Sequence, residues 1–433
     1  MIESRDSKAF VLKYDSSQTS NQGNKMATIL RSLFNRRMLS VLLYGISSGV
    51  PLLLIGSTLK AWMKDEGVDL TIIGIYALAG LPYTLKFLWA PFMDRFTPPF
   101  LGRRRGWIAI CQIALALGFI LMSLIKPLEN PAFLGLLAFL IAFFSASQDI
   151  AIDAYRRDVL EDQELGLGSS MSVNGYRVGM LIAGAVALAL ADQIPWNQVY
   201  LVMAVIMGLG LIVNLFAPEP VDHTVRPVTT LRDAIVLPFT DYLSRPHAWE
   251  ILAFILLFKI GDSMASDMFN PFFQDLGFSK TEIATVAKLF GFWATIGGGF
   301  LGGVAMVRWG VAKSLWIFGT LQTVSTAGFC ILANLGHSIE ALTITILLEN
   351  ASTGMATTAY VAFMASLCNK RFTATQYALL SSLMGIPRVI FGSSSGYLAK
   401  SLGWQSYFLL CVVLHLPGML MLFRQKVWSK ATI

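Results

Sequence analysis

Ten ionisable side chains interrupt the longest apolar runs of this sequence, and these are the residues best suited to do chemistry. They are Lys86, Arg177, Lys259, Lys288, Arg388, Asp149, Asp153, Asp262, Asp267 and Glu349. A charge at the centre of a bilayer costs at least about 2.5–3.5 kcal/mol, so each one needs a partner or a water-filled cavity. A cycle that binds a charged solute and moves protons would use such groups. For any single member, an ion pair that merely joins two helices is the alternative.

Two of these residues, Arg177 and Arg388, are the strongest candidates to bind an anion, because a guanidinium offers a planar fork of donors that matches a carboxylate. Each is followed by a valine, within two short segments that resemble each other. Lys259 and Lys86 supply further cations. Polar and aromatic neighbours complete the expected substrate-binding set, namely Tyr83, Tyr176, Gln148 and Asn350.

Three carboxylates are candidates for proton coupling. Asp149 lies four residues before Asp153, so the two share a helix face. A carboxylate that is partly removed from water can load and release protons, and we assign this role first to Asp149, with a fixed salt bridge as the alternative. Glu349 is the second choice. Asp262, three residues after Lys259, is the third, and the two can also neutralise each other.

A polar loop near position 100 has the composition of a conformational gate. An Asp94-Arg95 pair ends one apolar run, and a Gly-Arg-Arg cluster with Arg103 and Arg104 precedes the next. Such carboxylate and guanidinium groups can pair with neighbouring helix ends in one state and separate in another. We place Asp153 in the same gate because Arg156 and Arg157 follow it. The alternative is a loop that is only positively charged.

Composition assigns the whole chain to the membrane. Of its 433 residues, 55% are hydrophobic and 14% are charged, whereas about 25% of the residues of a soluble protein are charged. A soluble enzyme and a nucleic-acid-binding domain are therefore excluded as classes. The four cysteines and four histidines are scattered, so we expect no metal, no cofactor and no enzymatic site.

A run of glycines, 297–303, is not a phosphate-binding loop, because it lies inside an apolar run and no Lys-Ser or Lys-Thr follows it. Its small-xxx-small spacing instead predicts close contact between helices. The sequence contains no nucleotide-binding cassette. We therefore expect the energy source to be an ion gradient or the gradient of the solute itself.

Twelve apolar runs are long enough to cross a bilayer, which takes about 20 residues. They are 38–62, 70–92, 107–125, 131–154, 168–191, 196–217, 248–274, 281–306, 314–333, 338–366, 375–399 and 404–423. The predicted fold class is an all-α integral membrane protein of twelve helices in two six-helix bundles. The domains are a tail (1–37), a first bundle (38–217), a linker (218–247) with a short surface helix at 230–244, a second bundle (248–424) and a tail (425–433).

Charge asymmetry predicts the orientation. By our count, 23 of the 33 basic residues fall in the tails and loops on the side of the N-terminus, and five fall in the loops on the other side. Lys and Arg are enriched in cytoplasmic loops, so both termini are expected in the cytoplasm. The six-plus-six arrangement and the repeated Arg-Val segment indicate the plan of the major facilitator superfamily.

Several segments closely resemble the muropeptide permeases of the AmpG family. They include Met93-Asp94-Arg95, Ser145–Ile150, Gly175-Tyr176-Arg177, Ala217-Pro218-Glu219-Pro220, Leu348-Glu349-Asn350 and Ala374-Thr375-Gln376. The resemblance runs from about residue 37 to residue 424. It implies proton-driven import of N-acetylglucosaminyl-anhydro-N-acetylmuramyl sugars and peptides across the bacterial inner membrane, and a link to β-lactamase induction.

The expected partners are a small-molecule substrate and membrane lipid, with no nucleic acid and a monomeric chain. Members of the family often carry further C-terminal spans, whereas this chain ends after twelve, so the substrate range stays open. A transporter of another solute such as a siderophore, or an exporter, is the alternative.

Overall fold

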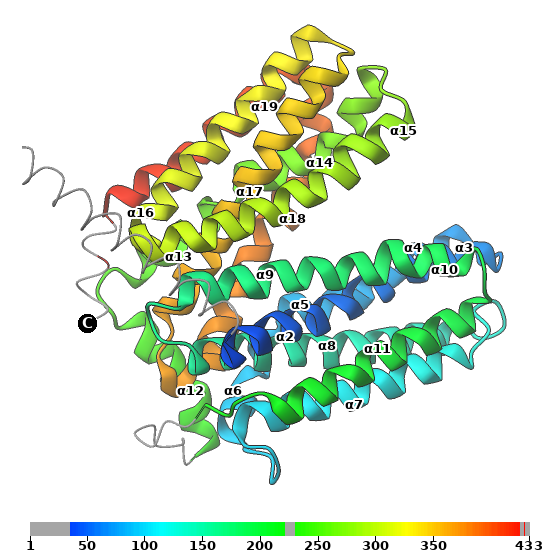
Figure 1. Ribbon diagram of the computed structural model, residues 1–433, viewed down its shortest axis with the longest axis vertical. Coiled ribbons are helices and arrows are strands. Elements are labelled where there is room, and N and C mark those ends of the chain that lie inside the picture. The colour runs from blue at the N-terminus through cyan, green and yellow to red at the C-terminus, as the bar shows by residue number, and fades with distance from the viewer. Residues whose placement is uncertain (1–34, 221–229, 425–427, 429–433) are drawn as a thin grey trace, which may run out of the picture.

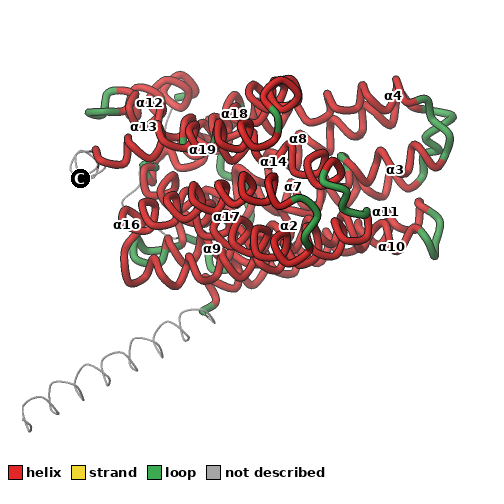
Figure 2. Tube along the Cα trace, turned by 90° about the horizontal axis from the view of Figure 1, so that it is seen from above, coloured by secondary structure: helices red, strands yellow, loops and turns green. Residues whose placement is uncertain are grey.

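The computed structural model describes residues 35–220, 230–424 and 428. The predicted tails therefore lie largely outside the described residues, as does the centre of the predicted linker. Within the described part the chain forms helices joined by loops and turns, with no strand (Figure 2). This agrees with the predicted all-helical class.

The first half of the molecule, as we call the helices before residue 217, is built from long helices and one strongly divided segment. Its elements are α2 (Arg36–Leu54), α3 (Ser57–Asp65), α4 (Leu70–Ile75), η1 (Tyr76–Gly80), α5 (Leu81–Leu85), η2 (Lys86–Leu88), α6 (Ala90–Arg95), α7 (Arg103–Ser123), α8 (Pro131–Val159), α9 (Leu165–Leu181), η3 (Ile182–Val186), α10 (Ala187–Ala191) and α11 (Trp196–Phe216).

The second half, from residue 248 onward, has a similar make-up. Its elements are α13 (Ala248–Leu257), α14 (Ile260–Asp275), α15 (Lys280–Glu282), η4 (Ile283–Phe290), α16 (Gly291–Leu335), α17 (Ile339–Leu367), η5 (Lys370–Phe372), α18 (Thr373–Leu402), α19 (Trp404–Met421) and η6 (Leu422–Arg424). The predicted runs 281–306 and 314–333 share α16, which bends at Gly310, where φ is +74°.

Among the described residues, seven helices are long and apolar enough to cross a membrane by length and composition. Some predicted runs are divided instead. Run 70–92 falls into short α and 3₁₀ pieces around Pro82 and Pro91, and run 248–274 is interrupted at Lys259 between α13 and α14. Proline removes a backbone donor and interrupts a helix, which accounts for the first division.

The two halves meet at one end and diverge toward the other (Figure 1). They are in contact through α9 against α16 and α17, and through α5, α6 and α8 against α18. The end where they meet carries the loop between α6 and α7, and α12 (Leu231–Leu243). At the opposite end, the α3–α4 and α14–α15 connections lie well apart (Figure 1).

Glycines on α16 allow it to approach α17 and α9 closely. A Cβ added at Gly298 or Gly302 would collide with the α17 backbone at Ala351 or Met355, and one added at Gly299 would lie 2.6 Å from Asn174 Oδ1 on α9. The glycine run therefore brings α16 against both neighbours at once, as its spacing predicts.

The predicted linker helix is present as α12. Thr230 caps its N-terminus by accepting a hydrogen bond from the Asp233 backbone N–H at 3.1 Å. One face, with Ala234 and Tyr242, is buried against the protein, while Ile235 and Val236 remain exposed. The helix therefore docks on the ends of α6 and α18 and does not lie free on a surface.

Candidate functional site

A group of charged side chains that we call the first-half cluster forms where the divided helix meets α8. Lys86, in the η2 break, lies 3.9 Å from Asp153 Oδ2, and Arg156 Nη2 lies 3.1 Å from Asp153 Oδ1. Asp149, one turn earlier on α8, accepts a hydrogen bond from the Ser48 hydroxyl. Asp153 is thus shared by two cations, and one of them is Arg156, the neighbour on which its predicted gate role rests.

The polar side chains around this cluster differ in whether their polar atoms have hydrogen-bond partners. Tyr83 donates its hydroxyl to Ser145 Oγ at 2.8 Å. Gln148 is fully buried, and neither its amide oxygen nor its amide nitrogen has a hydrogen-bond partner. Buried amides are rarely left unpaired, so Gln148 has hydrogen-bonding capacity that the described residues do not use. Tyr176, on α9, is half-buried.

The second-half cluster lies at the other interrupted helix. Lys259, at the break between α13 and α14, donates to Asp262 Oδ2 at 3.0 Å and to Thr357 Oγ1 at 3.1 Å. Gln322 Nε2 donates to the second oxygen of Asp262 at 2.7 Å. Both oxygens of this carboxylate are therefore occupied, one by a cation three residues away on the same element.

Glu349 on α17 completes the second-half cluster. Its side chain is 2% exposed. Its nearest partners are hydroxyls, since Ser325 Oγ lies 2.6 Å and Thr326 Oγ1 3.3 Å from Oε2. The neighbouring Asn350 accepts from Thr295 Oγ1 at 2.9 Å, so it joins α17 to α16.

Arg177 connects the two halves. Its Nη1 donates across from α9 to the backbone oxygen of Thr295 on α16, at 3.1 Å. Two turns closer to the joined end, Ser170 Oγ donates to the oxygen of Gly299 at 2.7 Å. Arg388 stands in α18 after Pro387, but its side chain lies outside the described residues.

The polar loop forms a network that we call the loop network. Asp94, at the end of α6, accepts from the Thr375 backbone N–H and hydroxyl, each at 2.8 Å. It lies at the N-terminus of α18, where free N–H groups and the helix dipole favour an anion. Arg104 Nη1 lies 3.0 Å and Arg103 Nη2 3.7 Å from the other Asp94 oxygen.

Sequence reasoning missed several members of this contact between the halves. Asp158 accepts from Arg104 Nε at 2.7 Å and from the Thr373 hydroxyl at 2.7 Å. The Arg156 guanidinium lies 5.1 Å from the ring centre of Tyr377 on α18. A threonine pair opening a helix was the available signal, since such residues gather where free N–H groups attract a carboxylate.

Arg95, by contrast, takes no part in the loop network. Its guanidinium lies over the ring of Phe96 at 5.3 Å, and within the described ranges no carboxylate is within ion-pair distance. Of the residues predicted for a gate in this loop, the loop network therefore contains Asp94, Arg103 and Arg104, and it also includes Asp158.

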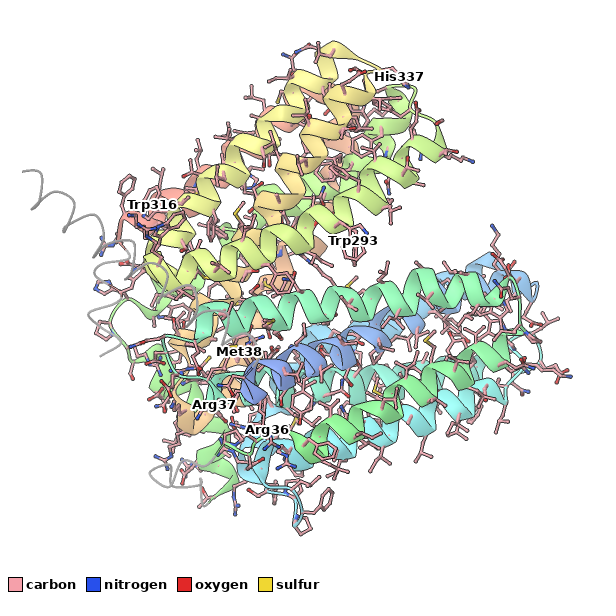
Figure 3. The ribbon with its side chains drawn as sticks, in the orientation of Figure 1. Arg36, Arg37, Met38, Trp293, Trp316 and His337 are labelled. Atoms are coloured by element: carbon pink, nitrogen blue, oxygen red, sulfur yellow. The ribbon has the colours of Figure 1, made fainter. Side chains whose placement is uncertain are left out.

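Trp293 is an aromatic side chain that sequence reasoning also missed. It projects from α16 into the space between the halves, beyond Thr295 on the diverging side (Figure 3), and it is 59% exposed. An exposed indole face of this kind suits the face of a sugar ring. Over the described part of the chain, no three His, Cys, Asp or Glu side chains gather as a metal site would require.

The sequence matches the family model described as Major Facilitator Superfamily over residues 37–392 and 263–430. It is 42% identical over 395 residues to a protein of Escherichia coli (strain K12) named anhydromuropeptide permease, covering 91% of this chain and 80% of that one.

Solved structures give the same fold. A human organic anion transporter superimposes with a TM-score of 0.70 at 14% identity, covering 89% of this chain and 99% of the other. A fucose:proton symporter of Escherichia coli gives 0.70 at 11% identity, covering 89% and 96%. At these identities the likeness concerns the fold alone.

Proposed function

The chain belongs to the major facilitator superfamily and, within it, to the muropeptide permease (AmpG) family, and from this premise we propose that it imports anhydro-muropeptides together with protons. Its relatives are transporters and not enzymes. The expected solutes are N-acetylglucosaminyl-anhydro-N-acetylmuramyl sugars and peptides, brought across the bacterial inner membrane for cell-wall recycling.

The proposal includes twelve spans, two six-helix bundles and both termini in the cytoplasm. The strong basic excess at the joined end supports this orientation. With that end inside, the halves are closed toward the cytoplasm and open toward the outside, as a solute-accepting state requires. Release to the cytoplasm then needs the loop network to part and the diverging ends to close, which is alternating access.

The observation that carries the proposal is the placement of Lys86 and Lys259. Each lies at a break within an apolar segment, one in each half, beside a carboxylate. Interrupted helices are where transporters of this kind place their solute sites. A muropeptide carries carboxylates, and one of these can replace Asp153 or Asp262 as the ion-pair partner of the lysine. Arg177 offers a third cation.

The rest of the solute meets the polar and aromatic groups. Gln148 has free donors and an acceptor for an amide or hydroxyl. Tyr83, Tyr176 and Trp293 supply faces for sugar rings. Asp149, Glu349 and Asp262 are the candidates to carry the proton, so that energy comes from the proton gradient and no cofactor is needed.

The test is uptake of labelled anhydro-muropeptide by vesicles containing the purified protein, with and without an inwardly directed proton gradient. Accumulation that collapses when a protonophore is added is the expected result. Uptake to equilibrium only would remove the proton from the proposal. Absence of uptake, or stronger competition by a ferric siderophore than by unlabelled muropeptide, would overturn the substrate assignment.

A further inference from the structure

Glu349 and Asp149 differ from Asp153 and Asp262 because, among the described residues, neither forms an ion pair with a cation. Asp153 has Lys86 and Arg156, and Asp262 has Lys259 at 3.0 Å. Within the described residues, no lysine, arginine or histidine lies within ion-pair distance of Glu349. At 2% exposure it also has little access to water.

The hydroxyls around Glu349 have other acceptors for their protons. Ser325 Oγ and Thr326 Oγ1 each lie 2.9 Å from the backbone oxygen of Gln322, and Ser352 Oγ lies 2.6 Å from that of Leu348. Each hydroxyl has one proton to give. If those protons go to the backbone, nothing remains to donate to a carboxylate.

A protonated Glu349 resolves this shortage of donors. Its own O–H can donate to Ser325 Oγ across the observed 2.6 Å, which lies in the normal range for O–H···O bonds. The Ser325 hydroxyl then donates its own hydrogen bond to the backbone oxygen of Gln322 or to Ser352 Oγ, 2.8 Å away. Every group in this cage then has a partner, whereas an ionised carboxylate would be a buried charge without a cation, which is costly.

From this proton inventory we infer that Glu349 is the site that holds the coupling proton, and that it is protonated in the outward-open conformation. The inference rests on the proposed function only in its claim that this proton is coupled to solute transport. Asp149, our first choice from the sequence, differs in its donor: among the described residues the Ser48 hydroxyl has no other acceptor, so its proton remains free to stabilise an ionised Asp149.

The position of Glu349 ties the proton to the solute site. Three ionisable groups interact electrostatically with Glu349: the carboxylate of Asp262, the ammonium group of Lys259 and the thiol of Cys411. Gln322, whose backbone accepts from the cage, also holds Asp262 through its side chain. Loss of the Glu349 proton would place a second negative charge beside Asp262. That charge would draw Lys259 away from a bound anion and favour solute release.

The direct test is infrared difference spectroscopy of the purified full-length protein as the pH is raised, without any solute. A protonated carboxylic acid gives its own carbonyl band, which disappears on ionisation. We expect that band in the wild type and in Asp149→Asn, and its loss in Glu349→Gln. Ser325→Ala keeps the acid but removes its hydrogen-bond partner, so the band should remain at a shifted frequency.

Transport supplies the second readout. Glu349→Gln should still exchange labelled for unlabelled anhydro-muropeptide across vesicles, and it should lose all accumulation driven by a proton gradient. A titrating band that survives Glu349→Gln, or no such band in the wild type, would overturn the inference. If the wild type carries no muropeptide but its band still vanishes in Glu349→Gln, the substrate proposal fails and the proton site stands.

Discussion

The two halves of this protein solve the same electrostatic problem in different ways. In both, a lysine lies at an interrupted helix beside a carboxylate. In the first half, Asp153 divides its contacts between Lys86 at 3.9 Å and Arg156 at 3.1 Å. In the second half, Lys259 and Asp262 form one close pair at 3.0 Å.

The difference indicates a division of labour. A shared network tolerates the loss or movement of one member, because another partner remains, which suits a site that exchanges partners with a solute. A close pair next to an uncharged acid is a two-state element, since ionisation of Glu349 changes the field that the pair experiences. The first-half cluster is thus the more adaptable one, and the second-half cluster is the one that can sense a proton.

The largest expected effect comes from breaking the close pair. Lys259→Met leaves Asp262 as a buried charge, which costs about 3–5 kcal/mol of folding free energy, and uptake should fall at least ~100-fold. Lys86→Met should cost less, because Asp153 keeps Arg156. Thermal unfolding of the purified proteins and vesicle uptake measure the two. The double variant Lys259→Met with Asp262→Asn should recover stability but not uptake, and equal destabilisation by Lys86→Met would contradict the comparison.

The next effect concerns how the first half holds the second. Asp94→Asn removes the charge that caps α18 and weakens charge-assisted hydrogen bonds worth about 1.5–3 kcal/mol, so the ratio of the two conformations should shift about 10–100-fold. Spin labels at Glu66 and Lys280, at the diverging end, should report a shorter distance. Arg95→Ala is the matched control, because Arg95 lies outside the loop network, and an equal shift in that variant would remove Asp94 from the gate.

Substitution of Arg177 tests whether arginines from both halves bind the carboxylates of the solute. Arg177→Lys keeps the charge but loses the planar fork, so uptake should fall about tenfold, the effect of about 1.4 kcal/mol, with expression unchanged. Arg388→Lys, at the repeated position in the second half, should behave alike. Amidation of the muropeptide carboxylates should remove the difference between wild type and variants. If both variants transport at the wild-type rate, neither residue binds the solute.

The smallest effect should come from Trp293, the aromatic side chain proposed to contact a sugar ring. Trp293→Ala removes an aromatic surface worth about 0.5–1.5 kcal/mol, so KM should rise about twofold to tenfold with kcat nearly unchanged. Trp293→Phe should keep most of the affinity. Concentration dependence of uptake separates KM from kcat. An unchanged KM in Trp293→Ala would mean that the indole faces lipid or water and not the solute.

Part of the site follows from local sequence periodicity. Residues three or four apart lie together on a helix, which is why the Lys259–Asp262 pair and the shared face of Asp149 and Asp153 could be predicted. Thr230 was likewise recognisable as the start of a linker helix. Contacts between distant segments could not be predicted in this way, since nothing in the residues around Asp94 identifies Thr375 as its partner.

The sequence by itself determined that the chain lies in the membrane, that it is helical and that it resembles a transporter family, because these follow from apolar run length, charge content and motif order. Only the tertiary structure decided which acid is paired and which is caged, that Asp153 belongs with Lys86, and that Arg95 stays apart. The physical reason is that burial and donor supply depend on the packing of several helices at once. Glu349 and Asp262 are both acids in apolar runs, and they are distinguished only by their neighbours, which are hydroxyls on α16 for Glu349 and Lys259 at the start of α14 for Asp262.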